Sequence, residues 1–406
     1  MYSGNLYLGN LSLVTYLSPI VFLILSAQIP ATVLLLSRMM RGPFRHPPLK
    51  PKLSSCDRPN TVSVVVPTLN EVERLSPCLT GLGAQDSTLR EVLVVDSRSI
   101  DGTGDLVVAA AAKDNRFQLM EDPLLPSDWV GRPWALHNGF LATSPESEWV
   151  LGIDADTQPQ PGLIASLVEV AEKGNYDLIS LSPRFILKKP GEIWLQPALL
   201  MTLVYRFGAA GETGNEPNRV MANGQCFLCR RSLLTSLGGY TTARNSFCDD
   251  VTLARNAAAQ GAKVAFLDGA KVLKVRMYDG MAETWREWGR SLDLKDAAEP
   301  GQVWADLIFL ALVQGLPLVL LAFASGLWIS GMTTLIVLGL LVMNLVLVVM
   351  RFALLFAIAP SYDLSSATGK WLFWLSPFAD PAAVYRIFLS STRQPKQWRG
   401  RSYGAM

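Results

Sequence analysis

The stretch that decides the fold is "WVLGIDADTQP", residues 149–159, in which a short apolar run ends in two aspartates, Asp154 and Asp156, and a turn. A run of this length without alternation is typical of a strand buried within a parallel sheet. The carboxyl end of such a strand is where open α/β sheets bind their ligands. The stretch therefore predicts both a sheet and the edge of that sheet at which chemistry occurs.

Four further apolar runs repeat this design. Polar stretches that can form helices separate them, and strand and helix alternating in this rhythm indicate an α/β sheet with right-handed crossovers. We therefore expect one α/β domain over residues 61–296. The runs are residues 61–67, 91–96, 177–183 and 263–268, and helices are expected at 70–82 and 99–113.

Polar and acidic residues stand at the carboxyl ends of the expected strands. Each could merely cap the following helix, but their repetition at one edge favours a shared site. Carboxylate oxygens in small number suit Mg²⁺ or Mn²⁺, which keep water ligands and take the remaining ligands from phosphates. A nucleotide diphosphate is therefore the expected partner of this edge. The residues are Asn70 and Glu71, Asp96, and Asp154 and Asp156.

A second acid pair, Asp249 and Asp250, lies in "SFCDDVTLARNAAAQG", residues 246–261, and precedes an expected amphipathic helix. One carboxylate is enough to cap a helix. A carboxylate within hydrogen-bonding reach of a hydroxyl can also act as general base when that hydroxyl attacks. We expect Asp250 to be this base and Asp249 to support it.

Two common nucleotide-binding patterns are absent from the sequence. It contains no G-x-x-x-x-G-K-[ST], and no G-x-G-x-x-G follows the first expected strand, so the usual signatures of ATP hydrolysis and dinucleotide binding are missing. The stretch "DSRSIDGTGD", residues 96–105, supplies hydroxyls, Asp101 and a glycine turn, although these letters are also ordinary turn chemistry. The near balance of 36 basic and 34 acidic residues gives no sign of a nucleic-acid binder.

Half of the residues are hydrophobic and 17% are charged, and the apolar residues concentrate in three long runs. Each run exceeds the roughly 20 residues needed to cross a bilayer. Basic residues follow the first run and fill the tail, so the positive-inside rule places the α/β domain and the tail in the cytoplasm, and basic residues beside the spans can attract anionic lipid. The runs are residues 11–36, 305–329 and 332–359.

Two other apolar stretches are candidates for the membrane surface. Residues 371–389 are interrupted by two prolines and are expected to form an interfacial helix rather than a fourth span. Residues 190–206 fit either an interfacial helix or a buried amphipathic helix.

Five cysteines lie in the part of the chain assigned to the cytoplasm, and an odd number in a reducing compartment argues against a disulfide framework. Cys226 and Cys229 form a C-x-x-C pair, which zinc and redox sites use. No second pair accompanies it, and only His46 and His137 could join it. We therefore expect neither a metal nor a redox role for this pair.

These pieces, in this order, resemble the family 2 glycosyltransferases, whose GT-A fold is a Rossmann-like mixed sheet flanked by helices. The resemblance runs from about Val62 to Leu292, and the ordered set is specific although each piece alone is weak. The pieces are "VVVPTLNE" (64–71), "DSRSIDGT" (96–103), "GIDADTQP" (152–159), "NGQCFLCRR" (223–231) and "CDDVTLA" (248–254).

The resemblance implies a role for each matching residue. Asp154 and Asp156 become the motif that binds the metal and the diphosphate, and Asp250 becomes the base of an inverting displacement. The implied nucleotide-sugar site comprises Pro67, Asn70, Glu71, Asp96, Ser97, Asp101, Gly131, Arg132, Asp154 and Arg290, and the implied sugar or acceptor contacts are Trp129, Trp134, Asn223 and Gly224.

Two stretches narrow the resemblance. "DWVGRPWALHNG" (128–139) is similar to the W-x-G-[KR]-x-W-A segment of bacterial hopanoid-associated and carotenoid glycosyltransferases, a branch near the ceramide glucosyltransferases. "RMYDG" and "TWREWGRS", within residues 276–291, also suit that branch. Trp129 and Trp134 could equally be core residues.

One signature of the processive polysaccharide synthases, Q/R-x-x-R-W, is missing. Arg286 and Arg290 are four residues apart, and Ser291 stands where tryptophan would. This departure disfavours polymerisation.

The expected function is transfer of one sugar, with inversion, from a nucleotide diphosphate sugar, foremost a UDP-sugar, to a hydroxyl of a membrane lipid of the carotenoid, hopanoid or glycolipid type. We expect an integral protein of a bacterial inner membrane. A polyprenyl-phosphate or extracellular-polysaccharide sugar transferase and a non-catalytic nucleotide-sugar-binding scaffold subunit remain as alternatives. The expected division is a transmembrane helix at 1–40, a basic Pro-rich linker at 41–60, the catalytic domain at 61–296, two transmembrane helices at 297–360, and an interfacial helix and basic tail at 361–406.

Overall fold

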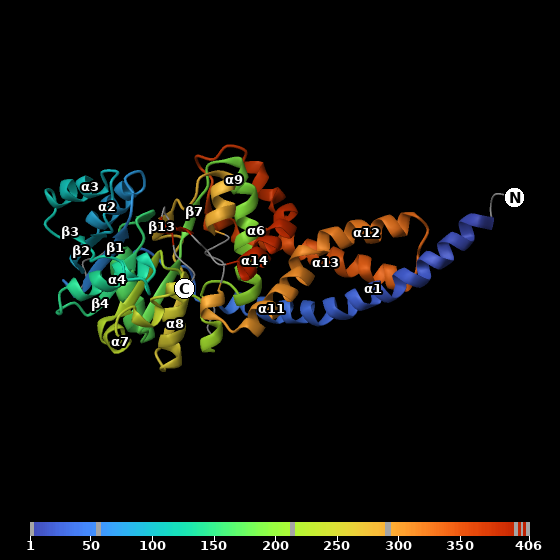
Figure 1. Cartoon of the computed structure of the whole chain (residues 1–406), viewed down its shortest axis with the longest axis horizontal. Helices are drawn as coiled ribbons and strands as arrows, with labels where there is room; N and C mark the ends of the chain where they lie inside the picture. Colours follow the sequence, from blue (N-terminus) through green and yellow to red (C-terminus); the bar gives the residue numbers. More distant parts are fainter. Residues whose placement is uncertain are drawn as a thin grey trace.

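A computed structural model describes residues 4–53, 58–211, 216–288, 294–393, 397–398 and 401–402. The molecule is elongated (Figure 1), with an α/β part at one end, long helices projecting at the other end, and a middle layer of shorter helices between them. Short elements outside these parts are η1 (Gly42–Phe44), η2 (Pro217–Arg219), η3 (Thr241–Ala243), η5 (Lys295–Ala297), η7 (Ala359–Ser361), β12 (Gln397–Trp398) and β13 (Arg401–Ser402).

The main sheet has seven strands in the order β3-β2-β1-β4-β8-β6-β9. β8 runs antiparallel to β4 and to β6, and the other pairs are parallel, so the expected mixed α/β sheet is confirmed. The sequence did not reveal β3 and β8 as strands. The strands are β1 (Val62–Thr68), β2 (Leu89–Asp96), β3 (Phe117–Glu121), β4 (Trp149–Ile153), β6 (Leu178–Ser182), β8 (Cys226–Arg230) and β9 (Val264–Asp268).

Helices cover both faces of this sheet, which explains why its strands are apolar without alternation. Val64 and Val66 of β1 face one core with α2, α3 and α5, while Val65 faces a second core with α4, α7 and α8. The helices are α2 (Leu75–Gly83), α3 (Thr103–Ala111), α4 (Gly131–Ala142), α5 (Leu163–Gly174), α7 (Arg231–Ser236) and α8 (Asp249–Ala259).

Two expected helix starts were wrong. α2 begins at Leu75 rather than at Asn70, which has a left-handed φ of 54° and whose Oδ1 accepts a hydrogen bond from the Ile100 amide. α3 begins at Thr103 rather than at Ser99, because the intervening residues form the loop that meets Asn70.

The C-x-x-C pair lies on β8 with its two thiols on opposite faces of the sheet. Cys226 belongs to the core with α2 and α5, and Cys229 belongs to the core with α4 and α8. Burial raises the pKa of both thiols above the ordinary range. Residues so separated cannot bind one metal ion or form a disulfide with each other.

A smaller sheet, in the order β11-β7-β10-β5, joins the α/β part to the chain that leaves the last long helix. β11 pairs with β7, and Lys274 Nζ lies 2.9 Å from Asp363 Oδ2. The strands are β5 (Thr157–Pro159), β7 (Arg184–Ile186), β10 (Leu273–Val275) and β11 (Tyr362–Asp363).

The long helices are the candidate membrane spans. Two described helices, at Pro19–Phe44 and Leu335–Ser361, are long and apolar enough to cross a bilayer. The other expected run is bent by 49° between Pro300–Gly315 and Pro317–Ile329, so it counts as a span only if the bent pair crosses as one. The elements are α1 (Gly4–Met39), α11 (Pro300–Leu310), η6 (Ala311–Gly315), α12 (Pro317–Ile329) and α13 (Leu335–Ile358).

A middle layer packs between the sheet and the long helices. Residues 190–206 lie in α6, and the full burial of Leu195, Leu199 and Tyr205 favours a buried amphipathic helix over an interfacial one. Residues 371–389 are not one helix but nearly all of η8 and most of α14, with Trp371 and Phe378 more than half exposed. The elements are α6 (Pro190–Phe207), α9 (Gly280–Glu283), η4 (Thr284–Trp288), η8 (Lys370–Ala379) and α14 (Asp380–Thr392).

Buried polar contacts fix this layer to the long helices. Arg351 Nε of α13 donates to Asp380 Oδ2 at 2.8 Å, and Gln314 Nε2 donates to Asp380 Oδ1 at 3.1 Å. Gln28 and Asn344 exchange hydrogen bonds between α1 and α13. Paired polar side chains of this kind join apolar helices where no water competes.

Candidate active site

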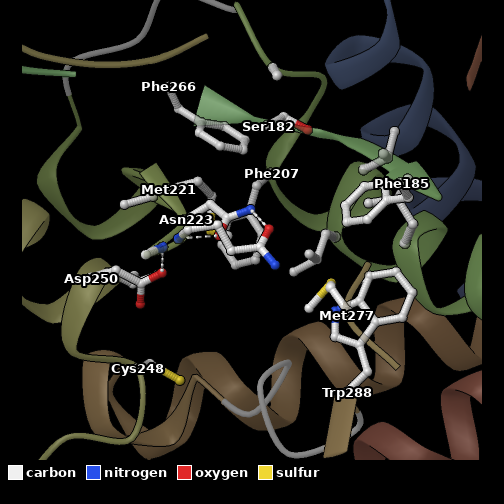
Figure 2. A pocket seen from close by; sticks show the side chains of 18 of the residues that line it. Ser182, Phe185, Phe207, Met221, Asn223, Cys248, Asp250, Phe266, Met277 and Trp288 are labelled. Atoms are coloured by element: carbon white, nitrogen blue, oxygen red, sulfur yellow. Dashed lines mark hydrogen bonds between the residues drawn. The ribbon is translucent and has the colours of Figure 1, made fainter. Parts of the chain in front are cut away.

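A cavity of about 1390 Å³ extends from the carboxyl edge of the main sheet to the middle layer and α13. Both acid pairs line it: Asp154 with Asp156, and Asp249 with Asp250. Figure 2 shows Asp250 and Asn223 facing the same space as apolar side chains that include Phe207, Met277 and Trp288. The cavity therefore joins carboxylates to an apolar wall.

The first acid pair stands where the chain turns from β4 into β5. Asp154 and Asp156 both line the cavity, while Ala155 between them is buried in the core. The Thr157 amide and hydroxyl both donate to the Asp154 carbonyl, at 3.2 and 2.7 Å, and close the turn.

Arg132, the second residue of α4, connects the two acid pairs. Its Nε donates to Asp154 Oδ1 at 2.9 Å, its Nη1 pairs with Asp249 Oδ2, and its Nη2 donates to the Gly224 carbonyl at 2.7 Å. Burial opposes the charge of Arg132, but Asp154 and Asp249 outweigh it and raise the pKa of the guanidinium. Arg132 therefore stays charged and holds three segments together.

The second acid pair occupies the first turn of α8. Asp250 Oδ2 accepts a hydrogen bond of 2.6 Å from the Gly224 amide, whose carbonyl is held by Arg132. Burial raises the pKa of Asp249 and of Asp250, and Arg132 opposes the rise. A Cβ at residue 224 would lie 2.5 Å from Arg132 Nη2, which explains the glycine there.

Six predicted nucleotide-site residues lie at the ends of β1 and β2 or in the loops that follow them, and they do not line this cavity. Asp96 accepts hydrogen bonds from Thr68 Oγ1 and from the amide and hydroxyl of Ser99, so its carboxylate joins the two strand ends. Asp101 accepts from the amides of Val72 and Thr103. The six residues are Pro67, Asn70, Glu71, Asp96, Ser97 and Asp101.

Most of these side chains are thus engaged within the loops. Ser97 Oγ donates to Asp122 Oδ2 at 2.8 Å, and the Glu71 amide donates to Thr103 Oγ1 at 2.8 Å. The hydrogen bonds of Asp101 show that its carboxylate shapes the loop. Contact between Asp101 and a nucleotide stays a prediction.

The two tryptophans of the 128–139 segment pack against each other. Their ring centroids are 5.0 Å apart, Trp129 is buried, and Trp134 Nε1 donates to the Pro123 carbonyl. Neither lines the cavity, which favours the core reading over sugar contact. Gly131 opens α4 beside them, and Arg132 alone of these four residues reaches the cavity.

The remaining predicted residues divide in two. Asn223 and Gly224 line the cavity, and the Asn223 amide donates to Ser180 Oγ at 2.6 Å. Arg290 lies outside the described residues.

Sequence reasoning missed several residues of the cavity wall. Arg74 donates to the Met277 carbonyl at 3.1 Å and pairs with Glu283 at 2.9 Å. Asp268 ends β9 and lies 3.9 Å from Arg45, so its place at a strand end was the signal that could have found it. The apolar wall combines residues distant in sequence, including Leu200, Leu203, Phe207, Met277, Trp288, Leu354 and Ile358.

The first acid pair fits a divalent ion that takes few ligands from the protein. Among the described residues, no three His, Cys, Asp or Glu side chains cluster as a metal site on their own. Mg²⁺ and Mn²⁺ are commonly held by one or two carboxylates together with water and substrate phosphates. Hydrogen bonding within the described chain engages Oδ1 of Asp154, and the cavity gives room for such ligands beside the pair.

The sequence and the fold were compared with those of known proteins. Residues 63–238 match the sequence model of "Glycosyl transferase family 2". A curated undecaprenyl-phosphate 4-deoxy-4-formamido-L-arabinose transferase of Serratia proteamaculans is 35% identical over 121 residues, which is 29% of this chain and 35% of that protein. A 4,4'-diaponeurosporenoate glycosyltransferase of Staphylococcus haemolyticus is 24% identical over 57% of this chain and 61% of that protein.

The match thus spans about a third of the first curated relatives and three fifths of the carotenoid enzyme. Among solved structures, a mannosyltransferase from Pyrobaculum calidifontis in complex with GDP-Man and Mn²⁺ superposes with a TM-score of 0.51 at 20% identity, covering 92% of this chain and 98% of that one. At this identity the likeness concerns the fold.

Proposed function

Because the chain carries a glycosyltransferase family 2 domain with the GT-A fold, we propose that it transfers one sugar, with inversion, from a nucleotide diphosphate sugar to a hydroxyl of a membrane lipid. The observation that carries this proposal is the cavity, which joins both acid pairs to apolar side chains of α6 and α13. A lipid held against α13 could bring its polar end to the carboxylates without leaving the bilayer surface.

The donor would lie between the loops after β1 and β2 and the first acid pair. Asp154 and Asp156 would hold a divalent ion, which when bound neutralises the charge that develops on the departing diphosphate. Arg132 would remain near this charge, since Asp249 and the Gly224 carbonyl hold it in place. The mannosyltransferase structure that superposes on this fold contains GDP-Man and Mn²⁺, which supports such a donor and ion.

Asp250 would act as general base. The lipid hydroxyl attacks the anomeric carbon, its proton passes to Asp250, a new carbon–oxygen bond forms, and the bond from the anomeric carbon to the diphosphate oxygen breaks. The Gly224 amide fixes Asp250 Oδ2, so the orientation of this carboxylate is set before the acceptor arrives. Burial raises the pKa of Asp250, which strengthens it as a proton acceptor once ionised.

A second candidate acceptor is a polyprenyl phosphate. Proteins named for transfer to undecaprenyl phosphate are 31–35% identical over about 30% of this chain. Arg386 and Arg393 of the cavity wall could meet a phosphate. A phosphate oxygen is already ionised and attacks without a general base. A hydroxyl acceptor would therefore need Asp250 as base, whereas a phosphate acceptor would not.

The proposed orientation rests on charge. Arg38 lies in the last turn of α1, Arg41 and Arg45 follow that helix, and basic residues recur in the tail. By the positive-inside rule, this charge supports a catalytic domain in the cytoplasm, where nucleotide sugars are made available, and we propose that the membrane is a bacterial inner membrane.

The test is transfer by the full chain in lipid nanodiscs, with Mn²⁺, radiolabelled nucleotide sugars, and either hydroxylated carotenoid and hopanoid lipids or undecaprenyl phosphate as acceptor. We expect a labelled lipid in the hydroxyl arm and its loss on adding EDTA. Donor binding without transfer or hydrolysis in any arm would instead establish a binding subunit.

A further inference from the structure

Guanidinium groups crowd around the side chain of Phe207, at the end of α6. The guanidinium carbons of Arg206, Arg219 and Arg255 lie 5.2, 6.0 and 5.9 Å from the centre of its ring. Arg219 Nη2 also donates to the Arg206 carbonyl. Three positive charges from α6, η2 and α8 therefore meet at one phenyl ring.

A fourth arginine joins them from α1. Arg38 Nη1 donates to the Tyr205 carbonyl at 3.0 Å, and its guanidinium lies 4.6 Å from the ring centre of Phe309 on α11. Asp306, also on α11, interacts electrostatically with all four arginines. We name Arg38, Arg206, Arg219, Arg255 and Asp306 the arginine cluster.

The arginine cluster contains four guanidinium groups and one carboxylate. Arg255 is 7% exposed, and its Nε and Nη1 donate to the Val220 and Ala297 carbonyls. Its Nη2 is buried and has no hydrogen-bond partner among the described residues. Burying like charges together is costly unless an anion compensates them.

The arginine cluster lies where the chain enters the membrane. Arg38 is in the last turn of α1, and the following Met40 and Phe44 are 73% and 87% exposed. On α11, Trp304 and Ile308 flank Asp306 in sequence and are also exposed. Exposed apolar side chains beside basic groups are typical of the level of lipid headgroups.

We propose that the arginine cluster binds the phosphate of an anionic phospholipid in the cytoplasmic leaflet. Arginine pairs with phosphate through parallel hydrogen bonds and so suits this ligand better than lysine would. The inference rests on the membrane placement within the proposed function and is independent of the transfer chemistry. Because Phe207 also lines the cavity, a lipid bound here would steady one wall of the active site.

The experiment measures which lipid the full chain retains. The protein in neutral detergent receives equal amounts of phosphatidylglycerol and phosphatidylcholine, and native mass spectrometry gives the ratio of the two bound lipids. We expect phosphatidylglycerol to be preferred. Replacing one cluster arginine, as in Arg219→Gln, should lower the preference about fivefold, which corresponds to about 1 kcal/mol per basic residue near anionic lipid.

Asp306→Asn gives the opposing variant. It removes the carboxylate that competes with a bound phosphate, so the preference for phosphatidylglycerol should rise. Arg58→Gln is the matched control, since Arg58 is half-exposed and pairs with Glu148 and Glu172 on the α/β part. It should leave the ratio unchanged.

Three outcomes would overturn the proposal. The first is equal retention of the two lipids. The second is a loss of preference in Asp306→Asn equal to that in Arg219→Gln, which would make the cluster a structural network. The third is displacement of phosphatidylglycerol by millimolar inorganic phosphate, which would make free phosphate the ligand. Retention is measured without donor or acceptor, so the ratio of bound lipids does not depend on whether the chain has transferase activity.

Discussion

The two acid pairs reach one cavity from different surroundings. Asp154 follows the end of β4 and keeps 28% of its side chain exposed, whereas Asp249 sits in the first turn of α8 with 4% exposed. Arg132 contacts both. Asp154 is open to ligands that arrive through water, whereas Asp249 is withdrawn from water, where a carboxyl group binds its proton more tightly.

This difference assigns separate tasks to side chains of one type. A partly exposed carboxylate at a strand end can take a hydrated ion and a diphosphate. A carboxylate that a backbone amide orients, as the Gly224 amide orients Asp250, is better suited to accept a proton from a substrate, because its environment decides which role an acid can take.

The largest expected effect is that of Asp250→Asn. The amide keeps the shape and can still meet the Gly224 amide through its oxygen, but it cannot take a proton, so turnover with a hydroxyl acceptor should fall about 1000-fold. Donor affinity, measured by calorimetry, should change little. Retained turnover with undecaprenyl phosphate would show that the acceptor is a phosphate.

Asp249→Asn is the control for that assignment. It removes one of the two carboxylate partners of Arg132 and should lower the melting temperature, because breaking a buried ion pair is destabilising. If a folded Asp249→Asn lost turnover more severely than Asp250→Asn, the two roles would be reversed.

Asp156→Asn tests the open pair. Donor affinity in the presence of Mn²⁺ should fall about 100-fold, equivalent to about 2.7 kcal/mol, while affinity measured in EDTA should be the same as that of the unaltered chain. Glu146→Gln removes one charge from an acid that is 74% exposed and should have no effect. Equal losses with and without Mn²⁺ would contradict an ion at this pair.

Gly224→Ala tests the connection between the pairs. A methyl group would lie 2.5 Å from Arg132 Nη2 and displace the guanidinium that both pairs share, so turnover should fall about tenfold with donor affinity also reduced. Gly301→Ala places its methyl group in open space and should be neutral. A fully active Gly224→Ala would show that the link is dispensable.

The smallest effect is expected from pH. Burial raises the pKa of Asp250 above its ordinary value of about 3.9, and the base must be ionised to act. The specificity constant kcat/KM should therefore rise as pH rises through the raised pKa and fall as pH falls below it. A profile that stays flat down to about pH 4 would place Asp250 outside the proton transfer.

The sheet could be predicted because its central strands are apolar without alternation and end in acids. β8 escaped prediction because "CFLCR" is short and its antiparallel direction depends on pairing with β4 and β6. The bend in the second apolar run could have been predicted, since Pro317 removes a helical hydrogen bond.

The site was predicted less completely than the sheet. Its acids stand out because each follows a strand or opens a helix. The contacts of Arg132 with Asp154 and Asp249 span 22 and 117 residues and depend on how α4 and α8 pack, which no local pattern encodes. The same holds for the apolar wall, to which α6 and α13 contribute from distant parts of the chain.

The pairing of β11 with β7 has a practical consequence for anyone who isolates the catalytic part. A fragment that stops before α11 would lack Tyr362 and Asp363, exposing the edge of β7 and removing the carboxylate next to Lys274. Bare strand edges promote aggregation. Solubilisation of the intact polypeptide should accordingly succeed where truncation yields precipitate.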